Sequence, residues 1–152
     1  MSMSTTTSED SEYTRRVEWL RRYLNVMKRR QLLVDELAER RAQAERATAI
    51  WDGTPTGRGF SGDRVGRSVD RIAAAQQRLA EHEERCAELR AEVLAVIRRE
   101  PDKRLRELLH RRYILGQTMN AIAAGLLISP GYAKRLHKRA VCGLEMLAEV
   151  QN

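Results

Sequence analysis

The residues of this sequence best suited to chemistry are basic side chains near its carboxyl end, which can pair with phosphate groups. The segment from Pro101 to Ala140 holds nine lysines and arginines against two acidic residues, a balance of +7. This balance equals the formal net charge of the whole chain, so the remaining residues sum to zero. Basic side chains are attracted to DNA phosphates, and counterions are released when these phosphates are neutralised. A localised excess of positive charge therefore indicates binding to DNA.

Short helices must position these side chains, and the segment carries start and stop signals for the first two of them. Residues Glu100 to Asp102 predict a helix start, with Pro101 at the first helical position and the Asp102 carboxylate at the positive end of the helix dipole. Gly116 can take the left-handed conformation that closes a helix, and Thr118 can cap the next one. The apolar positions of these two helices repeat every three or four residues: Leu105, Leu108, Leu109, Tyr113, Met119, Ile122, Ala123 and Leu126.

A third helix is predicted to begin at Pro130, with Ser129 as its cap. Because the apolar residues of this helix must face a core, the basic side chains between them should point toward solvent. Residues 100–149 are therefore expected to form a helix-turn-helix domain of three helices. The apolar residues of the third helix follow the same spacing as those before it: Ala133, Leu136, Ala140, Leu144 and Leu147.

The outward residues of the third helix are the candidate DNA contacts, since helix geometry would place them at the major groove or its flanking phosphates. Arg135 is the best candidate for base reading, because a guanidinium can pair with both acceptors of guanine. Lys134 and Lys138 are expected to contact phosphates, and Arg111 and Arg112 to touch the DNA backbone from the first helix. The alternative interpretation is the solvated face of a bundle helix. The full candidate set is Gly131, Tyr132, Lys134, Arg135, Lys138, Arg139, Arg111 and Arg112.

The run RRYILGQTMNAIAAGLLIS, followed by RLHKRA, resembles the fourth region of bacterial housekeeping sigma factors. It is still more similar to the sigma-region-four-like domain of small phage- and prophage-encoded proteins, relatives of phage late-gene transcriptional regulators. The resemblance covers the last third of the chain and implies DNA binding in transcription. This sequence departs from the pattern at Ala121, where glutamate is usual, and at Leu127, where glycine is usual and a branched residue resists positive φ. The matching positions are Arg112, Tyr113, Gly116, Thr118, Ile122, Ala123, Arg135, Leu136, His137, Arg139 and Ala140.

The amino-terminal two thirds of the chain are predicted to form two long helices. Residues 1–9, rich in serine and threonine, are expected to be a disordered tail. Residues 10–99 are expected to form an antiparallel, coiled-coil-like helical hairpin with a glycine-rich turn at 52–62. Its heptad-like apolar positions, Val65 and Val69 among them, can pair within the chain or with a second chain, which would make a homodimer. Low aromatic content (5%) and many charged residues (32%) favour such long helices over a broad core, and hence an all-α fold.

Several function classes have no support in the sequence. The two cysteines and three histidines stand at no metal-ligand or redox spacing, so no metal or cofactor is expected and a reduced, cytoplasmic setting is the simplest. His137 is expected to be a satisfied surface histidine without a base contact. The glycine-rich stretch at 57–62 lacks the lysine ending of a phosphate loop, and no nucleophile with a base is evident, so an enzyme is not expected. No stretch approaches the ~20 apolar residues of a membrane span.

The sequence therefore predicts a cytoplasmic, sequence-specific DNA-binding transcriptional regulator of phage or prophage origin, with double-stranded DNA as its partner. One alternative is a module that docks on RNA polymerase or another sigma-binding surface. A second alternative is the recognition subunit of a DNA-packaging machine, similar to a small terminase, because such subunits also combine helix-turn-helix and helical oligomerisation elements.

Overall fold

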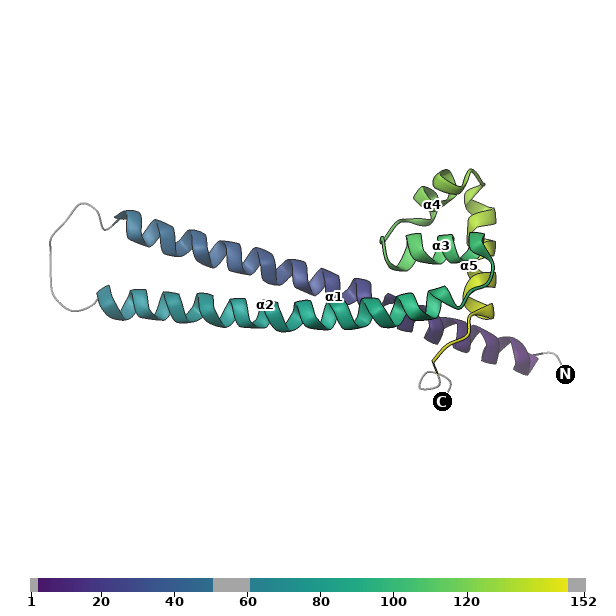
Figure 1. Ribbon diagram of the computed structural model, residues 1–152, viewed down its shortest axis with the longest axis horizontal. Helices are drawn as coiled ribbons and strands as arrows, with labels where there is room; N and C mark the ends of the chain where they lie inside the picture. The colour runs from purple at the N-terminus through teal and green to yellow at the C-terminus, as the bar shows by residue number, and fades with distance from the viewer. Residues whose placement is uncertain (1–2, 51–60, 148–152) are drawn as a thin grey trace. The chain divides into compact units, whose positions relative to one another are not determined.

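The computed structural model describes residues 3–50 and 61–147, and every regular element in these ranges is an α-helix (Figure 1). This confirms the all-α class. Most of the predicted glycine-rich turn, residues 52–60, lies outside the described residues. None of the helices described is long and apolar enough to cross a membrane. The helices are α1 (Met3–Ile50), α2 (Ser61–Arg98), α3 (Lys103–Tyr113), α4 (Met119–Leu126) and α5 (Pro130–Gly143).

Two compact units share the long helices. The first unit comprises Met1–Asn25 and Cys86–Asn152, and the second comprises Val26–Arg85. This division differs from the boundary at residues 99 and 100 that Pro101 suggested, because the beginning of α1 and the end of α2 belong to the same compact unit as the short helices. Helix α1 also begins earlier than expected, at Met3, so residues 3–9 of the predicted tail are helical.

The first unit holds most of the buried apolar residues that the structure describes. Helix α3 packs against α4 and α5, and α4 packs against α5. Tyr113, at the end of α3, is among the largest fully buried side chains. Burying a large apolar side chain of this kind stabilises the fold by roughly 1.5–3 kcal/mol. The long helices add Leu20, Tyr23, Leu89, Val93, Val96 and Ile97, and the short ones add Leu105, Leu108, Leu109, Ile122, Ala133, Leu136, Ala140 and Val141.

The start of α3 corrects one sequence-based expectation. Pro101 does not occupy the first helical position, because Asp102 is the N-cap and the helix begins at Lys103. The Asp102 carboxylate accepts from the backbone N–H of Arg104 at 2.8 Å and from that of Leu105 at 3.3 Å. A carboxylate that satisfies two free amides displaces the proline to the position before the cap.

The caps of α4 and α5 and the glycine after α3 have the conformations that the sequence predicted. Thr118 caps α4 by accepting from the N–H of Ala121, and Ser129 caps α5 by accepting from the N–H of Tyr132. Gly116 has a φ of 68°. These are confirmed predictions.

Two features near the ends of α4 and α5 were not expected. Leu127 takes the left-handed conformation at φ 56°, and its side chain is 92% exposed, so the turn between α4 and α5 forms without glycine. Helix α5 ends at Gly143, so Leu144 and Leu147 lie beyond the helix on which they were predicted. Leu144 remains buried, in an extended conformation.

The second unit consists of the later part of α1 and the earlier part of α2. Leu37 and Ala75 are its buried apolar residues among those the structure describes. The Arg30 guanidinium and the Glu83 carboxylate form an ion pair across the two helices at 2.9 Å. Leu32, Val65 and Val69 are largely exposed, although the heptad spacing predicted Val65 and Val69 in an apolar seam.

Candidate nucleic-acid interface

The solvent face of α5 is basic. Its buried face consists of Ala133, Leu136, Ala140 and Val141, which pack into the first unit. The four basic side chains between these positions are all exposed, and the helix contains no acidic residue. A helix packed through one face therefore presents positive charge with the other, the arrangement that phosphate binding requires. These exposed residues are Lys134, Arg135, Lys138 and Arg139.

The amino-terminal half of this face is open. Gly131 has no atom near the position that a Cβ would occupy. The Tyr132 ring is exposed and lies near two guanidiniums, with the Cζ of Arg135 5.7 Å and the Cζ of Arg104 5.8 Å from the ring centroid. A cation near an aromatic ring is attracted to it, which favours conformations of the long side chain that keep the two together. The structure therefore brings Arg104, from the start of α3, beside Tyr132 and Arg135, two of the predicted DNA contacts.

Arg104 was missed by sequence reasoning, although it belongs to the segment that carries the whole net charge. Its position on α3 gave no sign that it would reach α5.

The carboxyl-terminal half of the face has a neighbour on α1. The Lys138 ammonium lies 3.7 Å from the Asp10 carboxylate and 5.7 Å from the centroid of the Tyr13 ring. Both members of the ion pair are more than half exposed, so solvent screens their attraction. Lys138 therefore remains accessible to a phosphate, in competition with Asp10.

The two α3 arginines that were predicted to reach DNA, Arg111 and Arg112, make contacts within the chain. Arg111 pairs with Glu107, with Nη2 at 2.8 Å from the carboxylate oxygen, and a Cβ on Gly125 would lie 2.8 Å from its Nη1. Arg112 donates from Nη1 to the carbonyl of Gln117 at 2.9 Å. Arg111 therefore lies against the backbone of α4, and Arg112 holds the connection between α3 and α4.

His137 is held on both ring nitrogens. The Tyr113 hydroxyl lies 2.7 Å from Nε2, and the Tyr13 hydroxyl lies 3.2 Å from Nδ1. Burial, followed by the positive charges of Arg112 and Arg21, lowers the pKa of His137 to about 4. The imidazole is therefore neutral at physiological pH, with one nitrogen donating and the other accepting. His137 acts as a structural link between α1, α3 and α5 and not as a cationic DNA contact.

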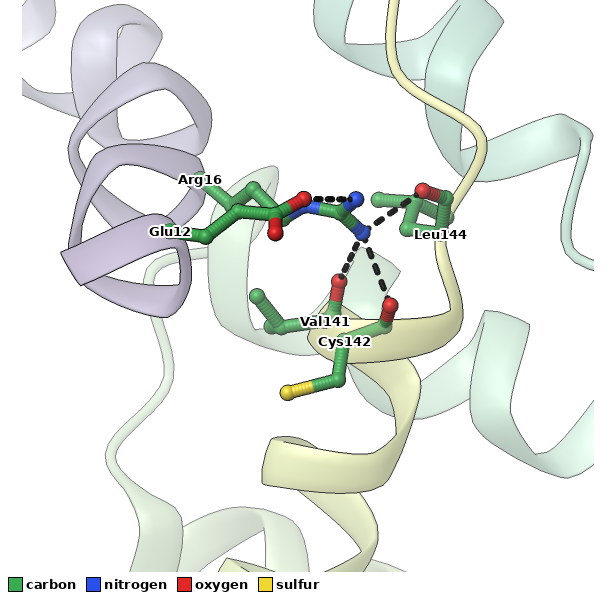
Figure 2. Close-up of polar contacts among 5 residues, drawn as sticks. All are labelled: Glu12, Arg16, Val141, Cys142 and Leu144. Atoms are coloured by element: carbon green, nitrogen blue, oxygen red, sulfur yellow. Dashed lines mark hydrogen bonds and ion pairs between the residues drawn. The ribbon is translucent and has the colours of Figure 1, made fainter. Parts of the chain in front are cut away.

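Arg16 closes the end of α5 from α1 (Figure 2). Its Nη1 donates to the carbonyls of Val141, Cys142 and Leu144, at 3.0, 2.8 and 2.9 Å. Helix ends leave carbonyls without intrahelical partners, and a cation there also interacts favourably with the helix dipole. Sequence reasoning missed both Arg16 and Tyr13, because their partners lie more than 120 positions away along the chain.

Within the ranges the structure describes, no group of three or more histidine, cysteine or acidic side chains is arranged to hold a metal ion. Comparison with protein-family models, with curated proteins and with solved structures found no match to this chain.

Proposed function

We propose that α3, α4 and α5 form a helix-turn-helix domain that binds double-stranded DNA through the exposed face of α5. The observation that carries the proposal is the set of four exposed basic side chains on a helix whose opposite face is buried. The capped start of this helix supports it further, because helix-turn-helix proteins place the first residues of the recognition helix against base edges.

The side chains divide into two roles. Lys134, Lys138 and Arg139 would contact phosphates, which sets the position of the domain on the duplex without reading its sequence. Arg135 would read guanine, because its guanidinium is exposed near the start of α5, beside the Tyr132 ring, and can pair with both acceptors of that base. The protein acts by binding, with no chemical step.

The biological setting is also part of the proposal. The similarity of the RRYILGQT and RLHKRA runs to sigma-region-four-like domains supports a cytoplasmic transcriptional regulator of phage or prophage origin. The ion pair between Arg22 and Glu92 in the first unit and that between Arg30 and Glu83 in the second support pairing of α1 with α2 as an antiparallel hairpin. A homodimer through the exposed apolar residues Val65 and Val69 is the alternative use of these helices.

A salt titration of binding to a mixed-sequence DNA duplex tests the proposal. Each neutralised phosphate contributes a slope of about −0.9 to a plot of log affinity against log salt. We expect the K134A variant to lower the magnitude of this slope by about one. The K28A variant is the matched control, since Lys28 is an exposed lysine of the second unit, and it should keep the parent slope. Affinity that does not depend on salt would contradict phosphate binding.

Selection of bound duplexes from a random pool then tests base reading. The R135A variant should lose discrimination at one or more base pairs by about 1–3 kcal/mol. An R135A protein that binds the selected sequence as tightly and as selectively as the parent would remove the role proposed for Arg135.

A second candidate function is docking on RNA polymerase or another sigma-binding surface. The observation that favours it is Leu127, an almost fully exposed leucine in a left-handed conformation at the turn between α4 and α5. Exposed apolar side chains and strained backbone positions are both more frequent where a protein meets a partner. Loss of polymerase binding in L127S, with DNA binding unchanged, would favour this second function.

A further inference from the structure

We infer that Arg16 is a positioning residue for α5, and that α1 thereby sets the placement of the DNA-facing helix. The inference rests on the proposed function, which assigns DNA contact to α5. It adds a requirement for a side chain that lies on another helix and has no predicted contact with DNA.

The guanidinium of Arg16 is held where α5 ends (Figure 2). Nη1 lies within 3.0 Å of two carbonyls of the last turn, Val141 and Cys142, and of the Leu144 carbonyl just beyond it. The Arg16 side chain is only 16% exposed, and its Nη2 donates to a Glu12 carboxylate oxygen at 2.5 Å. A donor anchored in this way satisfies free carbonyls at the point where α5 stops.

Two further contacts come from the same face of α1. Asp10, Tyr13 and Arg16 follow one another at intervals of three, which places them on one side of a helix. Asp10 pairs with Lys138, and the Tyr13 hydroxyl meets His137. Helix α1 therefore contacts the carboxyl-terminal half of α5 at three successive points, of which that of Arg16 is more buried than that of Asp10, while the half that carries Tyr132, Lys134 and Arg135 stays open.

This arrangement has a consequence for DNA binding. A recognition helix must present its side chains at fixed distances from the phosphates, and a displacement of about an ångström weakens charge-assisted contacts. The other end of α5 is fixed by its Ser129 cap. Without Arg16 the last turn of α5 would fray, and this end of the helix would be held only by the remaining contacts with α1 and by its buried apolar residues.

The experiment compares R16M with R15M in the full-length protein. Arg15 is the adjacent, exposed arginine, so both variants lose one positive charge from the same turn of α1. Binding to the mixed-sequence duplex is measured at a temperature at which circular dichroism shows both variants folded. We expect R16M to bind at least fivefold more weakly than R15M. A role in stability alone would leave the two affinities equal, because a fully folded population binds independently of its stability margin.

Amide hydrogen exchange without DNA supplies the independent readout. Exchange at Val141 to Leu144 should become at least tenfold faster in R16M than in R15M. Equal exchange and equal DNA affinity in the two variants would overturn the inference. Faster exchange with equal affinity would also overturn it, because Arg16 would then fix the helix end without affecting binding.

The two proposals fail in distinguishable ways. A parent protein without DNA affinity removes the proposed function, and the inferred role in DNA binding with it. Should R16M fail to fold, R16K remains informative, because its ammonium keeps the charge but lacks the second nitrogen through which Arg16 is anchored to Glu12. We expect R16K to show faster exchange at Val141 to Leu144 and weaker DNA binding than the parent. Parent-like values of both would overturn the inference.

Discussion

The two units of this protein are built from the same long helices but are stabilised differently. In the first unit, all five helices contribute buried side chains, and helix ends are closed by Asp102, Thr118, Ser129 and Arg16. In the second unit, two helix segments bury Leu37 and Ala75 among the residues described and are joined by the Arg30 to Glu83 ion pair. Exposed ion pairs contribute about 0–1 kcal/mol each, whereas buried apolar side chains contribute more.

This difference bears on function. A unit with its own core can leave Lys134, Arg135 and Arg139 exposed, because none of them is needed to hold the fold together. The second unit exposes Leu32, Val65 and Val69, and its stability rests more on local helix formation. We therefore interpret the first unit as the support of α5, the helix that we propose binds DNA.

The largest expected effect is on the free energy of unfolding, when one buried leucine is removed from each unit. L109A removes a side chain that is fully buried in the first unit, and L37A removes one that is 7% exposed in the second. We expect L109A to lower the free energy of unfolding by about 2–5 kcal/mol, because the cavity adds to the lost burial. L37A should cost clearly less, because the shallow packing around it can relax. Urea denaturation of both variants measures this, and equal losses would contradict the contrast between the units.

A smaller effect concerns pH and the first unit alone. Burial lowers the pKa of His137 from 6.5 to about 4, so the unfolded chain binds a proton more readily than the folded one between these values. The neutral imidazole therefore stabilises the fold fully above pH 6.5, and stability should fall as the pH drops from 6.5 toward 4. The loss is on the order of 3 kcal/mol at most, from 1.36 kcal/mol per pKa unit.

The control for this prediction is H137N, in which the titrating group is absent. Unfolding of both proteins is followed across the same pH range, and their difference isolates His137 from the carboxylates. A parent and variant with parallel pH profiles would show that His137 is not held neutral by its surroundings.

The smallest expected effect is on the stability of two turns within the first unit, each of which contains a residue with positive φ. Gly116 and Leu127 both have positive φ, at 68° and 56°. A left-handed conformation costs a non-glycine residue roughly 1–2 kcal/mol, so G116A should destabilise the protein by about 1 kcal/mol. L127G should stabilise it by up to about 1 kcal/mol, because the exposed leucine side chain contributes little packing. Thermal denaturation measures both. Destabilisation by L127G would show that Leu127 makes a contact that offsets its backbone strain.

Local features of the sequence predicted much of the helical framework. Thr118, Ser129 and Gly116 act on amides or backbone angles within four residues of themselves, so their roles follow from sequence alone. The outward direction of Lys134 and Arg135 was also predictable, because the apolar residues of α5 repeat at helical spacing. Pro101 was misplaced because Asp102 competes with it for the same helix start, and either choice satisfies the local rules.

The sequence by itself determined the helices, most of their caps and the basic composition of the last third of the chain, because these depend on neighbours a few positions apart. Only the tertiary structure decided that Arg16 closes α5, that His137 links Tyr13 with Tyr113, and that Arg104 meets Tyr132. These partners lie 24 to 128 positions apart where a hydrogen bond joins them. These contacts depend on how whole helices pack, and that packing is determined by the total burial of the core and not by any single local pattern.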